Sequence, residues 1–141
     1  MPNVTRSLWP KEITPEIVTP LAILKPQAEV LKDITNGILL GEVSVSQDAE
    51  QKKTYLTLDI IAPELGNYRQ QVLRVSHEAG RSYPAYVEAE CIGLGEEVNQ
   101  TNRAATDHDL YNLVAKVLQS DAVKSLAASL IARSNEITNG R

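Results

Sequence analysis

The sequence predicts an α+β domain in which an N-terminal helix is followed by a four-stranded antiparallel meander and two C-terminal helices packed on one face of the sheet. Apolar residues follow a helical period over residues 20–35, alternate with a period of two over residues 39–91, and return to the helical period after residue 106. Short polar loops between the alternating runs favour antiparallel pairing of consecutive strands. The chain has no Phe, and aromatic residues make up only 4% of it, so aliphatic side chains must fill the core.

The first predicted element is a helix over about residues 20–35. Thr19 is a suitable N-cap, Pro20 suits the first helical position, and Asn36-Gly37 supply a stop. Pro26 lacks an N–H and crowds the preceding turn, so we expect the helix to kink there or to begin just before it. The predicted apolar face consists of Leu21, Leu24, Ala28, Leu31 and Thr35.

Four alternating runs predict the strands: LLGEVSVS (39–46), TYLTLDII (54–61), YRQQVLRVSH (68–77) and YPAYVEAEC (83–91). Alternation places one set of side chains against the helices and the other set in solvent. In the third run it places Leu73 and Val75 on the core side, and Val72 and Arg74 on the solvent side. The long stretch of residues 93–105 is expected to be a loop.

The last third of the chain predicts two amphipathic helices. Thr106 and Asp109 resemble a capping box, and Ser120 or Asp121 can cap the second helix, which is expected to end near Ser134. The apolar positions recur at helical spacing in both: Leu110, Leu113, Val114, Val117 and Leu118, then Val123, Leu126, Ala127, Leu130 and Ile131. We therefore expect one domain over residues 19–134, between an extended arm (1–18) and a frayed tail (135–141).

The arm carries three prolines and the only tryptophan, Trp9. An indole exposes a large apolar surface, so we expect Trp9 to dock on the domain or on a partner.

Composition narrows the class of partner. Fourteen Lys and Arg against 18 Asp and Glu give a net charge of -4. The basic residues are scattered, so they form no positive patch that would bind a nucleic-acid backbone. The apolar runs are too short to span a bilayer, and the N-terminus lacks the apolar region of a signal peptide. Cys91 is the only cysteine, so no intramolecular disulfide forms. These features indicate a cytoplasmic protein whose partner is another protein or a second copy.

Three stretches, TPLAILKPQAEVL, LDIIAPELGNYRQQVLRVSH and the following YP, resemble a loose group of small bacterial cytosolic proteins with no assigned function. The resemblance covers Thr19 to Ser134 and implies a compact bacterial α+β domain. It implies no activity, substrate or binding residue.

The stretch RVSHEAGRSYP (74–84) holds His77 beside Glu78. Adjacent strand side chains diverge, so this pair does not form a catalytic dyad, and the preferred interpretation is a hairpin turn. His77 is then expected to be partly exposed, and Gly80 to adopt a positive φ. Replacing Gly80 should therefore destabilise the protein more than His77→Ala.

Other candidate sites have simpler structural explanations. His108 lies between two aspartates in the first turn of a helix, where the three side chains fan out and cannot hold one metal ion. Cys91 has the inward parity of the fourth strand and no identifiable activating base. GLGEE (93–97) lacks the lysine of a phosphate-binding loop. We expect no catalytic, metal or cofactor site in these residues.

The solvent face of the sheet remains as the candidate interaction surface, and its residues are Tyr55, Thr57, Asp59, Arg74, Tyr86 and Glu88. Tyr and Arg are favoured at interfaces. The sequence thus favours a non-enzymatic interaction module, such as an adaptor, a specific chaperone or an immunity-type protein. The alternative is an enzyme or ligand-binding domain with a pocket between sheet and helices, drawing on Tyr83, His77 or Cys91. A cavity of several hundred cubic ångströms with convergent polar groups would favour this alternative over the interaction module.

Overall fold

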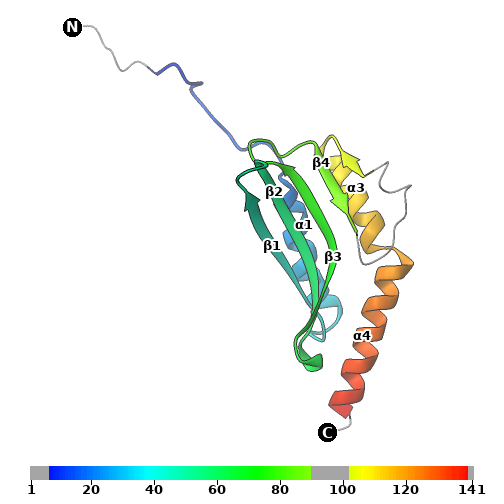
Figure 1. Cartoon of the computed structure of the whole chain (residues 1–141). Coiled ribbons are helices and arrows are strands. Elements are labelled where there is room, and N and C mark those ends of the chain that lie inside the picture. Colours follow the sequence, from blue (N-terminus) through cyan, green and yellow to red (C-terminus); the bar gives the residue numbers. More distant parts are fainter. Residues whose placement is uncertain (1–6, 90–101, 140–141) are drawn as a thin grey trace, which may run out of the picture.

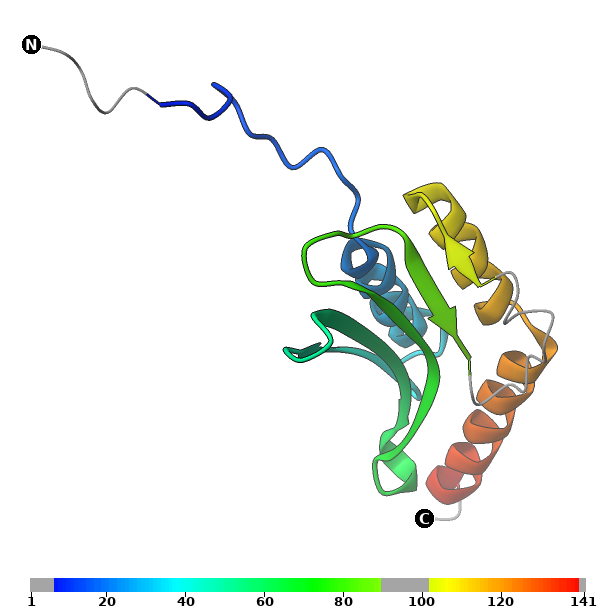
Figure 2. The same cartoon turned by 45° about the horizontal axis from the view of Figure 1, so that its top comes forward.

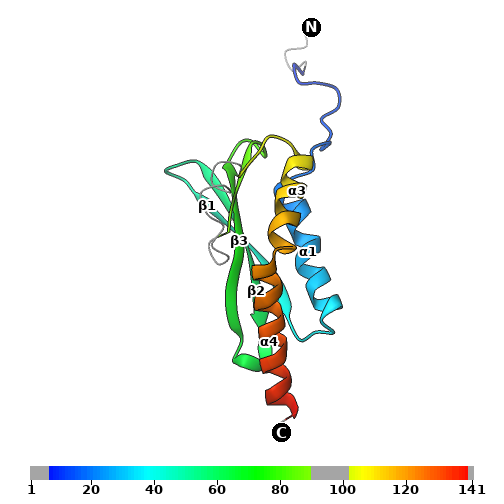
Figure 3. The same ribbon diagram turned by 90° about the vertical axis from the view of Figure 1, so that its right-hand side faces the viewer.

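The computed structural model describes residues 7–89 and 102–139. All three described helices lie on one side of an antiparallel sheet, so the predicted α+β class and the one-sided packing of the helices are confirmed (Figure 1, Figure 3). The elements in chain order are α1 (Pro20–Ile34), β1 (Leu40–Asp48), β2 (Lys53–Ala62), the 3-10 turn η1 (Pro63–Leu65), β3 (Tyr68–Glu78), β4 (Ala85–Glu88), β5 (Arg103–Ala104), α3 (Asp107–Leu118) and α4 (Asp121–Asn139).

Helix α1 runs through Pro26 without interruption. The Thr19 hydroxyl accepts a hydrogen bond from the N–H of Ala22 (3.2 Å), which satisfies one free donor of the first turn. Pro26 is exposed, so its ring faces solvent and the helix loses only one internal hydrogen bond. The buried face of α1 is rotated slightly from the predicted one, because Leu21 is exposed and Ile23 is buried instead.

The sheet has the order β1-β2-β3-β4-β5, with every neighbouring pair antiparallel. The fifth strand was not predicted. It consists of two residues, Arg103 and Ala104, which pair with Tyr86 and Ala85 of β4. Two residues are too few to show a period, so their strand conformation depends on pairing with β4. The rest of the loop predicted over 93–105 lies mostly outside the described residues.

A bulge in β3 reverses the predicted orientation of Val72. Leu58 of β2 pairs with Leu73, whereas the next residue, Asp59, pairs with Gln71, so β3 accommodates one extra residue between them. Val72 and Leu73 are both buried as a result. The prediction that Val72 faces solvent was wrong because simple alternation assumes an unbroken register.

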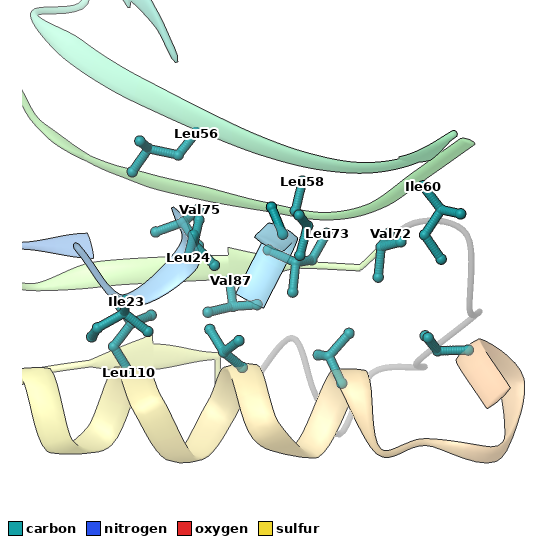
Figure 4. Close-up of a cluster of buried hydrophobic side chains, with 14 of the residues drawn as sticks. Ile23, Leu24, Leu56, Leu58, Ile60, Val72, Leu73, Val75, Val87 and Leu110 are labelled. Carbon is teal, nitrogen blue, oxygen red and sulfur yellow. The ribbon is translucent and has the colours of Figure 1, made fainter. Parts of the chain in front are cut away.

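The core lies between the sheet and the helices (Figure 4). Leu56, Leu58 and Ile60 point from β2 toward the helices, as their alternation predicted. From the other layer, α1 contributes Ile23 and Leu24, and α3 contributes Leu110. Helix α4 continues to Asn139, beyond its predicted end at Ser134, and buries Val123, Leu130 and Ser134.

Glycine at position 41 allows α1 to approach β1 closely. A Cβ atom at Gly41 would lie 2.6 Å from both the Cα and the carbonyl oxygen of Ala28, and these backbone atoms cannot move aside without displacing the helix. No positive φ is involved, so the requirement for glycine is one of space.

Gly41→Ala should therefore lower the free energy of unfolding by about 1–3 kcal/mol, as overpacking of a core usually does. Gly80→Ala is the matched control, because a Cβ at Gly80 would meet no atom within 4 Å. It should change stability by less than about 0.5 kcal/mol. Urea denaturation of both variants measures the difference, and equal stabilities would contradict the close packing of α1 on β1.

Candidate functional site

The six residues predicted for the solvent face all lie on the side of the sheet opposite the helices. Strand register arranges five of them in two rows across β2, β3 and β4. In one row Tyr55 lies beside Ser76, which lies beside Tyr86. In the next row Thr57 lies beside Arg74, which lies beside Glu88. We call this surface, together with Asp59, the open face; no helix among the described residues covers it (Figure 3).

Arg74 organises the centre of the open face. Its guanidinium donates two hydrogen bonds to one carboxylate oxygen of Glu88, at 3.0 Å from Nε and 2.5 Å from the terminal nitrogen. The same guanidinium lies 4.9 Å from the centre of the Tyr55 ring, within the range of a cation–π interaction. These contacts come from three strands and hold Arg74 in one orientation. The surface is thus ordered before any partner arrives.

A second charge cluster lies at the other end of the face and was not predicted. Arg69 of β3 donates hydrogen bonds to Glu42 (3.1 Å) and Asp59 (2.8 Å), and these bonds raise its pKa above the ordinary value. Asp59 is only 8% exposed, so a partner has little access to it. Simple alternation in β3 would place Arg69 on the core side, and only the bulge at Val72 brings it to the open face.

The charged groups of the open face are therefore largely neutralised within the protein. A tyrosine side chain therefore remains available for contact with a partner: Tyr86, in the short strand β4, is 40% exposed. Such a surface offers flat aromatic area with a hydroxyl at its tip, flanked by fixed ion pairs. It suits contact with a protein surface better than it suits chemistry on a small substrate.

His77 closes the loop between β3 and β4. Its Nδ1 lies 2.7 Å from the carbonyl oxygen of Glu78 and 2.8 Å from that of Arg81. Carbonyl oxygens only accept, so Nδ1 carries the proton and donates. The side chain is half-buried, and Gly80 does not have a positive φ. The prediction for Gly80 was wrong, because the imidazole holds the loop by side-chain hydrogen bonding and no left-handed residue is needed.

His77→Ala should consequently destabilise the protein by about 1 kcal/mol, the usual net value of one hydrogen bond. His108→Ala is the control, since His108 is exposed in the first turn of α3. Thermal melts should show a lower Tm for His77→Ala and a nearly unchanged Tm for His108→Ala. Equal Tm values would show that the His77 hydrogen bonds do not stabilise the loop.

Tyr83 attaches the base of the N-terminal arm to the domain. Its hydroxyl donates a hydrogen bond of 2.6 Å to the carbonyl oxygen of Val18. Desolvation by burial, assisted by the negative charge of Asp107, raises the pKa of Tyr83 to about 12. The hydroxyl therefore stays protonated, and able to donate, throughout the neutral range.

This pKa predicts a loss of stability in alkali. The pKa in the folded state lies above the ordinary value of 10.0, so the contribution of Tyr83 is complete below about pH 10 and disappears as the pH rises toward 12. Tyr83→Phe should lack this loss of stability between about pH 10 and 12. Tyr111→Phe, which changes an exposed tyrosine of α3, should still show it. Urea denaturation at several pH values distinguishes them, and identical pH profiles for all three proteins would contradict the assignment.

An apolar groove of about 610 Å³ lies between α1 and α4, with β2 and β3 as its floor. Its walls include Val30 and Ile34 of α1 and Val123 and Ile131 of α4, and its floor includes Ile60 and Val72. We call this cavity the α1–α4 groove. Neither Tyr83 nor His77 lines it, and Cys91 lies outside the described residues. Tyr83 instead lines a separate, more open hollow of about 580 Å³, between the base of the arm, the β3–β4 loop and the start of α3.

Polar groups are sparse in the α1–α4 groove. Gln27, Gln119 and Lys124 line it, together with Asp59, whose carboxylate is bonded to Arg69. The Thr35 hydroxyl is already bonded to the backbone of Leu31 and Leu39. Ligand pockets usually combine apolar walls with a few converging polar groups. The groove has the volume of such a pocket but few groups to orient a polar ligand.

Within residues 7–89 and 102–139, no three His, Cys, Asp or Glu side chains converge as a metal site would require. Over the same residues, no helix has both the length and the apolar character needed to cross a bilayer. Comparisons of the chain with protein-family profiles, with curated proteins and with solved structures find no match.

Proposed function

We propose that the protein is a non-enzymatic interaction module that binds another protein through the open face of its sheet. The observation that carries this proposal is the fixed cluster of Tyr55, Arg74 and Glu88 beside the exposed ring of Tyr86. An adaptor, a specific chaperone and an immunity-type protein would each use such a surface. The lone cysteine supports action in the reducing cytoplasm.

The arrangement of charge supports binding over catalysis. Arg74 and Glu88 neutralise each other, and Arg69 is shared by Glu42 and Asp59, which leaves that cluster with one net negative charge. Each of these groups is thus held in an ion pair, which does not favour a role as general acid or base. Paired charges can be covered by a partner at lower cost than isolated charges, because each retains its hydrogen bonds when water leaves. Tyr86 then supplies the contact area that the charged residues do not.

The volume of the α1–α4 groove favours a second candidate, a carrier of an apolar ligand. Its apolar walls would accept an alkyl chain or aromatic ring. The groove offers no cluster of titratable groups for chemistry, so this candidate is a binding function as well.

Binding through the open face predicts that Tyr86→Ala weakens capture of the partner about tenfold, the usual effect of truncating a central aromatic residue. Tyr111→Ala is the matched control, because Tyr111 is also exposed but lies on α3, away from the open face. Tagged full-length chains are expressed in the native cell, and captured proteins are quantified by mass spectrometry. The proposal predicts a protein retained by Tyr111→Ala and lost by Tyr86→Ala; the absence of any such protein contradicts it.

A further inference from the structure

The N-terminal arm exposes several large apolar side chains, which belong neither to the open face nor to the α1–α4 groove. Residues 7–18 contact the domain at their base and otherwise extend away from it (Figure 1, Figure 2). Trp9 is 78% exposed, so the expected docking of its indole on the domain does not occur within the chain. The other large apolar side chains of the arm, which are also exposed, are Leu8, Ile13, Ile17 and Val18.

We propose that the α1–α4 groove of one copy of this chain receives the N-terminal arm of a second copy, with Trp9 and Ile13 as its anchors. The exchange is reciprocal, so each copy gives one arm and receives one, and the product is a two-fold symmetric dimer. This inference concerns the helical side of the sheet and is independent of the function proposed for the open face.

The arm and the groove match in length and character. A strand-like segment rises about 3.3 Å per residue and carries side chains i and i+4 on the same face, so an extended arm would place Ile13 about 13 Å from Trp9 and on the same side. The groove follows α1 from Gln27 to Thr35, a helical rise of about 12 Å. Two apolar anchors at this spacing can therefore occupy the two ends of the groove. They would cover Ile34, which is 72% exposed, and Val30 beside it.

Charge complementarity gives the arm a preferred position in the groove. Residues 7–18 of the arm carry Lys11, Glu12 and Glu16, a net charge of -1, whereas Lys124 lines the groove. The Lys124 side chain forms no ion pair with any described residue. A seated arm would bring these opposite charges together at the solvent-exposed edge of the groove.

The direction of the arm favours a second copy over the chain's own groove. Hydrogen bonds at Val18 and Thr19 fix the exit of the arm at the N-terminal end of α1, whereas the groove follows the C-terminal half of that helix. Beyond that point the arm bends at Ile17, Lys11 and Trp9 but continues away from the domain (Figure 1). Return to its own groove would require a sharp reversal next to Val18, whereas the groove of another copy can be reached without one.

Trp9 is the only tryptophan, so its fluorescence reports on the arm alone. For the full-length chain we expect sedimentation analysis to show a dimer, and the tryptophan emission to shift to shorter wavelength as the dimer forms with rising concentration. A monomer with exposed Trp9 at all concentrations would overturn the proposal. So would a monomer with buried Trp9, because the arm would then occupy its own groove.

Substitutions on the groove test the docking site. Ile34→Lys should raise the dimer Kd about tenfold or more and keep Trp9 exposed. Ile137→Lys is the matched control, because Ile137 is also exposed near a helix C-terminus but does not line the groove. It should leave the Kd and the fluorescence unchanged. Both residues are exposed, so the fold should persist, and circular dichroism verifies it. A dimer equally sensitive or equally insensitive to the two changes would overturn the proposal.

Mixing two defective chains separates arm exchange from any other contact. Trp9→Ser leaves the groove intact, and Ile34→Lys leaves the arm intact, so the mixed pair can seat one arm in one groove. We expect each variant alone to be monomeric at a concentration where the mixture forms a heterodimer with buried Trp9. If no heterodimer forms, the proposal fails. It also fails if native mass spectrometry finds a copurified apolar molecule bound to a monomer whose Trp9 is exposed.

Discussion

The contact between Ala28 of α1 and Gly41 of β1 determines how the layers of this domain fit together. A side chain at position 41 would overlap the helix backbone, so glycine sets the distance between α1 and the edge of the sheet. At that distance Leu24 is fully buried against the strands. The same placement makes the C-terminal half of α1 a wall of the α1–α4 groove and fixes the point where the arm leaves the domain.

The bulge at Val72 determines which residues of β3 face the core and which face the open side of the sheet. One extra residue in β3 turns Val72 into the core and moves Arg69 to the open face, where it binds Glu42 and Asp59. A single local irregularity thus supplies an apolar residue to the floor of the groove and a cation to the open face. Without it, Asp59 would be a nearly buried carboxylate with no cation beside it, which is costly in free energy.

The sequence was informative wherever a regular period continued over many residues. The alternation of Leu56, Leu58 and Ile60 with Tyr55, Thr57 and Asp59 predicted both faces of β2, and Thr106 correctly marked the start of α3. The failures in the sheet and its loops share one physical cause, which is dependence on contacts between segments that are separate in the sequence. The bulge requires β2 opposite β3, β5 requires β4, and the hydrogen bonds of His77 require the loop to be closed. A pocket between sheet and helices was kept as an alternative, but the residues that line the α1–α4 groove were not predicted, because they come from helices nearly a hundred residues apart.

The two proposed surfaces differ in the physical chemistry of what they can bind, and they lie on opposite sides of one sheet. The open face presents paired charges and tyrosine, as is usual for partners that associate and separate. The α1–α4 groove presents almost continuous apolar surface, which is more typical of permanent contacts. Filling the groove leaves the open face uncovered, so both can be occupied at once. An arm-exchanged dimer would then display two open faces, and a partner with two copies of its binding surface would be held more tightly through avidity, without any additional contact on either face.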